Sequence, residues 1–160
     1  MGENAKPVKK ILIICTGNSC RSIMAEGYLA KRLKDIDASD TLVLSAGTYA
    51  SNGARPTDEA IQVMKEHGID VSGYVASKLS KIHIDNADII LVMEPHHKET
   101  VLNMSPDAEG KTYLLRSFSS ERKHRNNSIK DPIGKPIEFY REVFGIIKDS
   151  MEGFLEWLQK

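Results

Sequence analysis

Short apolar runs alternate along the 160-residue chain with stretches of helical periodicity. The first run, Ile11 to Ile14, is continuous and rich in β-branched residues, which is typical of a strand buried on both faces of a parallel sheet. Similar runs predict strands over 41–44, 88–93 and 112–115, and helical spacing predicts helices over 24–34, 58–67, 95–103 and 137–158. The alternation predicts an α/β fold: a single three-layer domain with a four-stranded parallel sheet covered by helices on both faces.

The segment that joins the first strand to the first helix carries an unusual polar sequence. It reads Cys15-Thr16-Gly17-Asn18-Ser19-Cys20-Arg21-Ser22. In parallel sheets, ligands bind at the carboxyl ends of strands, where the N–H groups of a helix N-terminus attract anions. Gly17 allows the backbone to curl closely around a phosphate-like oxyanion, and the planar guanidinium of Arg21 can pair with two of its oxygens. We therefore expect a phosphate-binding loop formed by residues 16–22.

Cys15 stands at the start of this loop, where the same positive field favours its thiolate over its thiol. A thiolate is a nucleophile at neutral pH, and the Ser22 hydroxyl can donate to its sulfur and stabilise it as a leaving group. An isolated cysteine at a strand end is usually a small buried hydrophobe. Its combination with Arg21 and Ser22 at a strand-to-helix junction instead indicates nucleophilic catalysis.

A carboxyl group near the C-terminus fits the same chemistry. Expelling an alkoxide or aryloxide from a phosphoester requires a proton for the leaving oxygen, and hydrolysis of a thiophosphate requires a base that activates water. One carboxyl can serve in both steps. Asp131 lies in the turn-forming stretch 130–134 ahead of the last helix, where a loop can reach the anion site.

Charge and composition limit the other functions open to the chain. With 22 Lys and Arg residues against 22 Asp and Glu residues, we expect no binding of nucleic acid or of acidic membranes. The 2 cysteines are too few for a disulfide scaffold, and no signal sequence or membrane-spanning run is evident, which predicts a cytoplasmic protein. We expect residues 1–160 to form one domain, a monomer or weak dimer, with residues 1–8 as a flexible N-terminus.

The chain resembles the low-molecular-weight protein tyrosine phosphatases. The resemblance extends from about Lys9 to Leu158 and includes the loop, Met24-Ala25-Glu26, Ser45-Ala46-Gly47-Thr48 and Asp131-Pro132. It implies hydrolysis of phosphotyrosine in phosphorylated proteins, with inorganic phosphate as product and with neither metal nor other cofactor. It also implies that Cys15 is the nucleophile that forms a cysteinyl-phosphate, Arg21 the phosphate clamp and Asp131 the general acid. By the same resemblance, Asn18 and Ser45 shape the loop.

Departures from the family pattern bear on the substrate. Ile23 stands where the family usually has proline, which affects the start of the helix more than the chemistry. Ser19 and Ile133-Gly134 replace bulky apolar and aromatic residues that are typical of tyrosine-directed members, and loss of an aromatic wall should weaken selection of phosphotyrosine. The bacterial protein arginine phosphatases of the same family resemble this pattern, so phosphoarginine is the alternative substrate.

Two further alternatives differ in chemistry. The loop also resembles that of thioredoxin-coupled arsenate reductases, but those enzymes relay a disulfide through additional cysteines after the third strand, and this chain has none between Met93 and Asn103. A non-enzymatic phosphate-binding module that uses the same loop is the other alternative, and it would show no turnover.

The remaining candidates concern Cys20 and the histidines. Family members with a second loop cysteine suggest that Cys15 and Cys20 form a reversible disulfide, and a small buried residue is the alternative interpretation of Cys20. His83, His96 and His97 lack a carboxylate or cysteine at matching ligand spacing, and adjacent histidines on a helix point to different sides. We therefore expect solvated histidines and no metal site.

Overall fold

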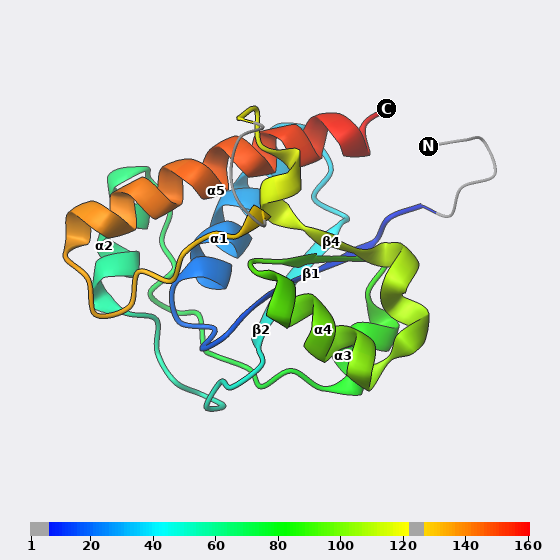
Figure 1. Ribbon diagram of the computed structural model, residues 1–160. Helices are drawn as coiled ribbons and strands as arrows, with labels where there is room; N and C mark the ends of the chain where they lie inside the picture. Colours follow the sequence, from blue (N-terminus) through cyan, green and yellow to red (C-terminus); the bar gives the residue numbers. More distant parts are fainter. Residues whose placement is uncertain (1–6, 122–126) are drawn as a thin grey trace.

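The centre of the protein is a parallel sheet, seen in the computed structural model, which describes residues 7–121 and 127–160 (Figure 1). Within that part the sheet has the strand order β2-β1-β3-β4, formed by β1 (Lys10–Cys15), β2 (Leu42–Gly47), β3 (Ile89–Val92) and β4 (Thr112–Leu114). All neighbouring strands pair in parallel. The predicted four-stranded parallel sheet is confirmed. Of the N-terminus expected to be flexible, residues 1–6 lie outside the described part, and Val8 packs against the core.

Helices cover both faces of this sheet (Figure 1). One face carries α1 (Arg21–Asp35), α2 (Asp58–Glu66) and α5 (Ile137–Leu158), and the other carries α3 (Lys81–Asn86) and α4 (Pro95–Met104). Short 3-10 helices, η1 (Pro106–Lys111) and η2 (Leu115–Phe118), flank β4. Helix α5 packs against α1, α2 and η2. The arrangement confirms the predicted three-layer α/β architecture.

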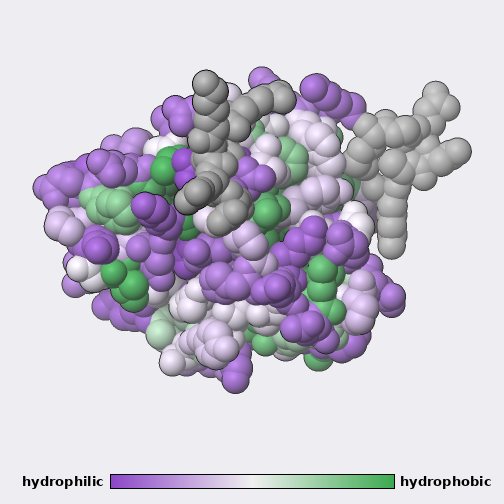
Figure 2. All heavy atoms as spheres, in the orientation of Figure 1, coloured by the Kyte–Doolittle hydropathy of each residue, from purple (hydrophilic) through white to green (hydrophobic). Residues whose placement is uncertain are grey.

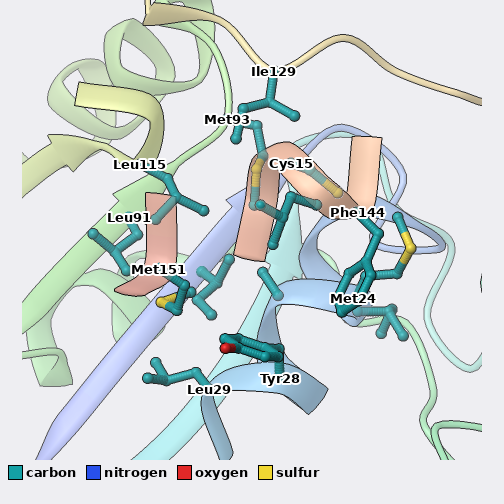
Figure 3. Close-up of a cluster of buried hydrophobic side chains, with 14 of the residues drawn as sticks. Cys15, Met24, Tyr28, Leu29, Leu91, Met93, Leu115, Ile129, Phe144 and Met151 are labelled. Atoms are coloured by element: carbon teal, nitrogen blue, oxygen red, sulfur yellow. The ribbon is translucent and has the colours of Figure 1, made fainter. Parts of the chain in front are cut away.

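The central strand β1 shows why its sequence is apolar without alternation. Ile11, Ile13 and Cys15 face the cluster formed with α1 and α5, whereas Leu12 and Ile14 face the cluster under α3 and α4. Figure 3 shows the larger cluster, with Cys15 among its members. Burying an aliphatic side chain of this size stabilises the fold by ~1.5–3 kcal/mol, so the strand that ends at Cys15 is firmly held.

Several elements differ from those expected: α1 begins at Arg21 rather than at 24, the two 3-10 helices were not expected, and β2 and α3 differ as follows. The strand predicted over 41–44 continues to Gly47, because Ser45 and Ala46 pair with Ile13 and Ile14 of β1. Helix α3 has no counterpart among the expected elements, since its 6 residues are too short to display helical periodicity. The longer β2 extends regular structure toward Ser45 and Gly47, which lie beside the loop that follows Cys15.

The surface is largely hydrophilic in the view of Figure 2, with small scattered apolar areas. Leu42, Leu44 and Ile82 are among the exposed large apolar side chains. Within residues 7–121 and 127–160, no helix combines the length and the apolar character needed to span a bilayer.

Candidate active site

The loop of residues 16–20 connects the end of β1 to the start of α1 at the carboxyl edge of the sheet. Asn18, which is completely buried, adopts a left-handed backbone with φ of 53°. Asparagine tolerates this conformation better than most residues do. The left-handed position of the loop is therefore Asn18 rather than Gly17, a feature that the sequence analysis did not identify.

Gly47, at the end of β2, is a second residue that sequence reasoning missed. A Cβ atom at this position would lie 2.4 Å from the carbonyl oxygen of Thr16 and 2.9 Å from the backbone nitrogen of Asn18. The following backbone N–H groups, of Thr48 and Tyr49, donate to the carbonyls of Cys15 and Thr16 at 3.0 and 2.9 Å. Only glycine allows β2 to lie this close to the loop, so Gly47 fixes the loop's outer side.

The sulfur of Cys15 lies within a directed hydrogen-bond network. The amide oxygen of Asn18 accepts from the backbone N–H of Ser77 at 2.8 Å, which defines the amide's orientation, and its Nδ2 donates to the hydroxyls of Ser22 at 2.7 Å and Ser45 at 2.9 Å. Because Ser22 accepts there, its own proton is available for Cys15 Sγ, 3.0 Å away. The backbone N–H of Asn18 also points at this sulfur, at 3.3 Å. Both contacts direct hydrogen-bond donors at the sulfur.

The network ends at a carboxyl group on α1. The Ser45 hydroxyl donates to the carboxyl of Glu26. Burial raises the pKa of Glu26 above its ordinary value, although the hydrogen bond from Ser45 opposes this shift. Hydrogen bonds thus connect Glu26 through Ser45 to Asn18 of the loop, as support of the loop by Ser45 would require. The sequence analysis quoted Glu26 only as part of a resemblance and assigned it no role.

Arg21 lies in the first turn of α1 with its side chain 1% exposed. Its Nη1 donates to Glu94 Oε2 at 2.6 Å and to the carbonyl of Ile129 at 2.7 Å. Its Nη2 lies 3.4 Å from Thr16 Oγ1 and 3.5 Å from Asp131 Oδ2. Its buried Nε has no hydrogen-bond partner among the described residues. A buried N–H of a cation that is left unpaired beside the loop can donate to an anion such as a phosphate oxygen.

Asp131 lies beside the loop, although it follows Arg21 by 110 residues in the sequence. Its Oδ1 accepts from the backbone N–H of Ile133 at 3.1 Å and from the thiol of Cys20 at 3.5 Å. Its side chain is 36% exposed, which leaves a face open to a substrate. Burial raises the pKa of Cys20 to about 12, with the negative charges of Cys15 and Asp131 adding to the shift. Cys20 is therefore a thiol, and both cysteines are free in this structure.

The expectation that the histidines are solvated is wrong for His97. This side chain is completely buried, and its Nδ1 accepts from the backbone N–H of Glu94 at 3.1 Å while its Nε2 lies 2.8 Å from Thr16 Oγ1. Its neighbour His96 is 54% exposed, as expected. Helical spacing over 95–103 does not indicate which side of the helix packs against the sheet, and this packing turns one of the adjacent histidines into the core.

Glu94, His96 and His97 form a cluster with potential ligand atoms within 4.8 Å of one another, so the expectation that no carboxylate lies at ligand spacing from the histidines is wrong for Glu94. Both ring nitrogens of His97 already have partners in the protein, however. Burial opposes ionisation of Glu94, but its hydrogen bonds to Arg21 and His96 and their positive charges together outweigh burial and lower the pKa of this carboxyl. The cluster is therefore organised around the Arg21 guanidinium.

Comparisons with known proteins agree with this geometry. A family model described as low molecular weight phosphotyrosine protein phosphatase matches residues 10–160. The chain is 37% identical over 151 residues to a protein-arginine-phosphatase of Geobacillus stearothermophilus, covering 94% of this chain and 96% of that protein. It is also 37% identical over 154 residues to a putative low molecular weight protein-tyrosine-phosphatase of Klebsiella pneumoniae, covering 94% and 95%.

Solved structures give the same result for the fold. The tyrosine phosphatase AmsI of Erwinia amylovora matches with a TM-score of 0.87 at 29% identity, covering 100% of this chain and 99% of that one. The arginine phosphatase YwlE of Geobacillus stearothermophilus matches with a TM-score of 0.82 at 36% identity, covering 96% and 94%. Both confirm the predicted fold class.

Proposed function

This chain belongs to the low molecular weight phosphotyrosine protein phosphatase family, and we propose that it hydrolyses phosphotyrosine in proteins through a cysteinyl-phosphate intermediate. The observation that carries the proposal is the sulfur of Cys15, which receives the Ser22 hydroxyl at 3.0 Å and the Asn18 N–H at 3.3 Å. Cys15 ends the buried strand β1, and the buried side chain of Arg21 lies next to the loop that follows.

In the first step, the thiolate of Cys15 attacks phosphorus in line with the departing phenolic oxygen. Arg21 and the backbone N–H groups of residues 16–22 hold the equatorial oxygens, where negative charge accumulates in the transition state. Asp131 gives its proton to the leaving oxygen, so tyrosine departs neutral and the phosphoryl group stays on sulfur.

In the second step, Asp131 takes a proton from water, and the resulting hydroxide attacks the phosphorus of the thiophosphate. The sulfur–phosphorus bond breaks, inorganic phosphate leaves, and the thiolate of Cys15 returns with the Ser22 hydroxyl as its donor. Charge stabilisation in both steps comes from Arg21 and the loop, so the proposed reaction needs neither metal nor cofactor.

Hydrolysis of p-nitrophenyl phosphate in the presence of EDTA tests this proposal. The unaltered protein should turn over, Cys15→Ser should lose essentially all turnover while still binding inorganic phosphate, and Asp131→Ala should slow leaving-group expulsion by roughly 10²–10⁴-fold. Asp40→Ala, which removes an exposed carboxyl ahead of β2, is the matched control. No turnover by the unaltered protein would instead support a phosphate-binding module.

Phosphoarginine is the competing substrate, since the similar proteins include arginine phosphatases and Ser19 provides little apolar surface for a phenyl ring. We propose a preference for phosphotyrosine, measured as kcat/KM on peptides that differ only in the phosphorylated residue. Ser19→Ile should increase that preference. A higher kcat/KM on the phosphoarginine peptide would overturn it.

We also propose that Cys20 is the reversible disulfide partner of Cys15. Peroxide would oxidise the Cys15 thiolate to a sulfenic acid, which condenses with the Cys20 thiol and releases water. Support comes from their shared loop and from the contribution of Cys15 charge to the raised pKa of Cys20. After brief peroxide treatment, dithiothreitol should restore activity to the unaltered protein but much less to Cys20→Ser; equal recovery would remove this role.

Phosphorylated proteins are the substrates implied by the family, and phosphate is the product. We propose further that the protein works in the cytoplasm as a monomer or weak dimer that binds neither nucleic acid nor membranes. The balance of 22 basic and 22 acidic residues and the two free thiols support this proposal. Sedimentation at two protein concentrations tests the oligomeric state.

A further inference from the structure

A buried histidine that the proposed reaction does not use connects helix α4 to the phosphate loop. His97 is completely enclosed, and both of its ring nitrogens contact groups of the site: Nδ1 the backbone N–H of Glu94, and Nε2 the hydroxyl of Thr16. A buried imidazole needs a hydrogen-bond partner for each ring nitrogen, and the partner of Nε2 is in the loop.

These two contacts define the protonation of the ring. Because Nδ1 accepts the Glu94 N–H, the single proton of a neutral imidazole is on Nε2, which then donates to Thr16 Oγ1 across 2.8 Å. Burial, together with the positive charges of His96 and Arg21, lowers the pKa of His97 to about 3, despite the opposing charge of Glu94. The ring therefore stays neutral, and the direction of both hydrogen bonds is constant.

The two residues that His97 contacts also contact Arg21. The Glu94 carboxylate accepts from Nη1 at 2.6 Å, and the Thr16 hydroxyl accepts from Nη2 at 3.4 Å. Together they hold both ends of the guanidinium fork and leave Nε as its unpaired N–H. The orientation in which Arg21 meets phosphate thus depends on two groups that one imidazole ring connects.

We propose that His97 is a positioning residue for the phosphate clamp: it fixes Thr16 and the Glu94 backbone so that the Arg21 guanidinium is oriented for phosphate before substrate binds. This inference rests on the proposed phosphatase function. His97 touches no substrate, and its effect on the reaction passes through Arg21. Preorganised donors cost no rearrangement during the reaction, and misplacement by about 1 Å can cost 10²-fold in rate.

His83 provides a control built into the same protein. At the start of α3 its Nδ1 accepts from the backbone N–H of Ser80 at 3.0 Å, so it performs the same helix-capping role as His97 does for α4. Its surroundings include Lys10 and Leu12 near the start of β1, whereas Thr16 follows the end of that strand. Substitutions at the two histidines therefore separate capping from positioning.

The experiment compares asparagine and glutamine at the two histidines. An asparagine oxygen can replace Nδ1 as the acceptor in the cap but cannot reach as far as Nε2, whereas a glutamine amide can reach the Nε2 position and donate from there. We expect His97→Asn to keep the cap and nevertheless to lower kcat on p-nitrophenyl phosphate by roughly 10–100-fold. His97→Gln should recover much of this loss, and His83→Asn and His83→Gln should leave kcat unchanged.

A second measurement links the loss to the clamp. His97→Asn should weaken competitive inhibition by inorganic phosphate, since the misplaced guanidinium holds the free anion less well, and Thr16→Val should make the His97→Asn substitution nearly silent. Thermal unfolding of each variant shows whether the fold is retained. His97→Leu offers a variant of similar volume if His97→Asn unfolds.

The outcomes separate this inference from the proposed function. If the unaltered protein has no turnover, the proposed function fails, and phosphate binding by the variants still reports on the clamp. If the unaltered protein turns over and His97→Asn has the same kcat and phosphate inhibition, His97 is only a cap and the inference is overturned. Equal losses of activity and stability in His97→Gln and His97→Asn would overturn it as well.

Discussion

Helices α3 and α4, on either side of β3 in the chain, begin with the same local device and yet differ in what that device does. In each, a histidine at the third helical position accepts the backbone N–H of the capping residue, at 3.0 Å for His83 and at 3.1 Å for His97. The second nitrogen of His97 reaches Thr16, and its capping residue Glu94 reaches Arg21. The comparison shows that tertiary position brings one helix cap into contact with Thr16 and Arg21, the residues of the proposed phosphate site.

The capping residues explain much of the difference. The Ser80 hydroxyl remains local, within 3.1 Å of His83 Nδ1, whereas the longer and charged Glu94 side chain leaves its own cap to pair with a cation. A serine cap stabilises a helix N-terminus by ~1 kcal/mol. A partly buried carboxylate paired with a buried guanidinium instead determines where that guanidinium points.

The largest effect should follow from replacing the Arg21 guanidinium, which Glu94 at the start of α4 contacts. Arg21→Lys retains a positive charge but loses the planar fork that pairs with phosphate oxygens, so kcat/KM should fall by ~10²–10³-fold, as for loss of an oxyanion donor. In this background His97→Asn should add little further loss. A full additional loss from His97→Asn, measured on p-nitrophenyl phosphate, would mean that His97 acts by a route other than Arg21.

A smaller effect should follow from changing each capping residue. Glu94→Gln retains the shape of the side chain but removes the charge that holds Arg21, so we expect kcat/KM to fall by ~10-fold, the equivalent of one charge-assisted hydrogen bond. Ser80→Ala should lower the free energy of unfolding by ~1 kcal/mol and leave kcat/KM unchanged. Loss of activity in Ser80→Ala would remove the contrast between the two helices.

The smallest effect concerns stability against pH. The folded-state pKa of His97 is about 3, below the ordinary 6.5, so between these values the unfolded chain binds a proton that the folded protein excludes. The free energy of unfolding should therefore fall as the pH falls from about 6.5 toward 3, and His97→Asn should flatten this fall. Urea unfolding at pH 6.5 and 5.5 measures it.

Other groups contribute to the same pH profile. The lowered pKa of Glu94 adds a loss of stability at the acidic end, while the raised pKa of Glu26 acts in the opposite direction, since its protonated form is favoured in the folded protein. The difference between the unaltered protein and His97→Asn isolates His97, and His83→Asn shows how much any histidine substitution changes the slope. An unchanged slope in His97→Asn would contradict a buried neutral ring.

The sequence allowed most of the sheet and the centre of the site to be predicted. The continuous apolar run before Cys15 indicated a strand buried on both faces, and the polar residues after Cys15 indicated a loop ahead of a helix, which the structure confirms, although α1 begins at Arg21 rather than at 24. These features are local, because each depends on residues within one strand, one loop or one turn. The catalytic roles of these residues stay predictions until tested.

The groups that tertiary structure alone revealed come from distant parts of the chain. Gly47 lies beyond the strand predicted over 41–44, Glu94 precedes the helix predicted over 95–103, and His97 was expected to be solvated. Nothing nearby in sequence indicates that each packs against residues 16–21.

Sequence by itself thus determined the chemistry available, namely a thiol, a guanidinium and a late carboxyl on a small α/β frame. Tertiary structure decided the surroundings of that chemistry: the close approach of β2, the ring that connects α4 to the loop, and the carboxylate that pairs with Arg21. The physical reason is the distance along the chain over which each effect acts. Periodicity and turn chemistry act over a few residues, whereas burial and hydrogen-bond pairing depend on which strands the sheet brings side by side.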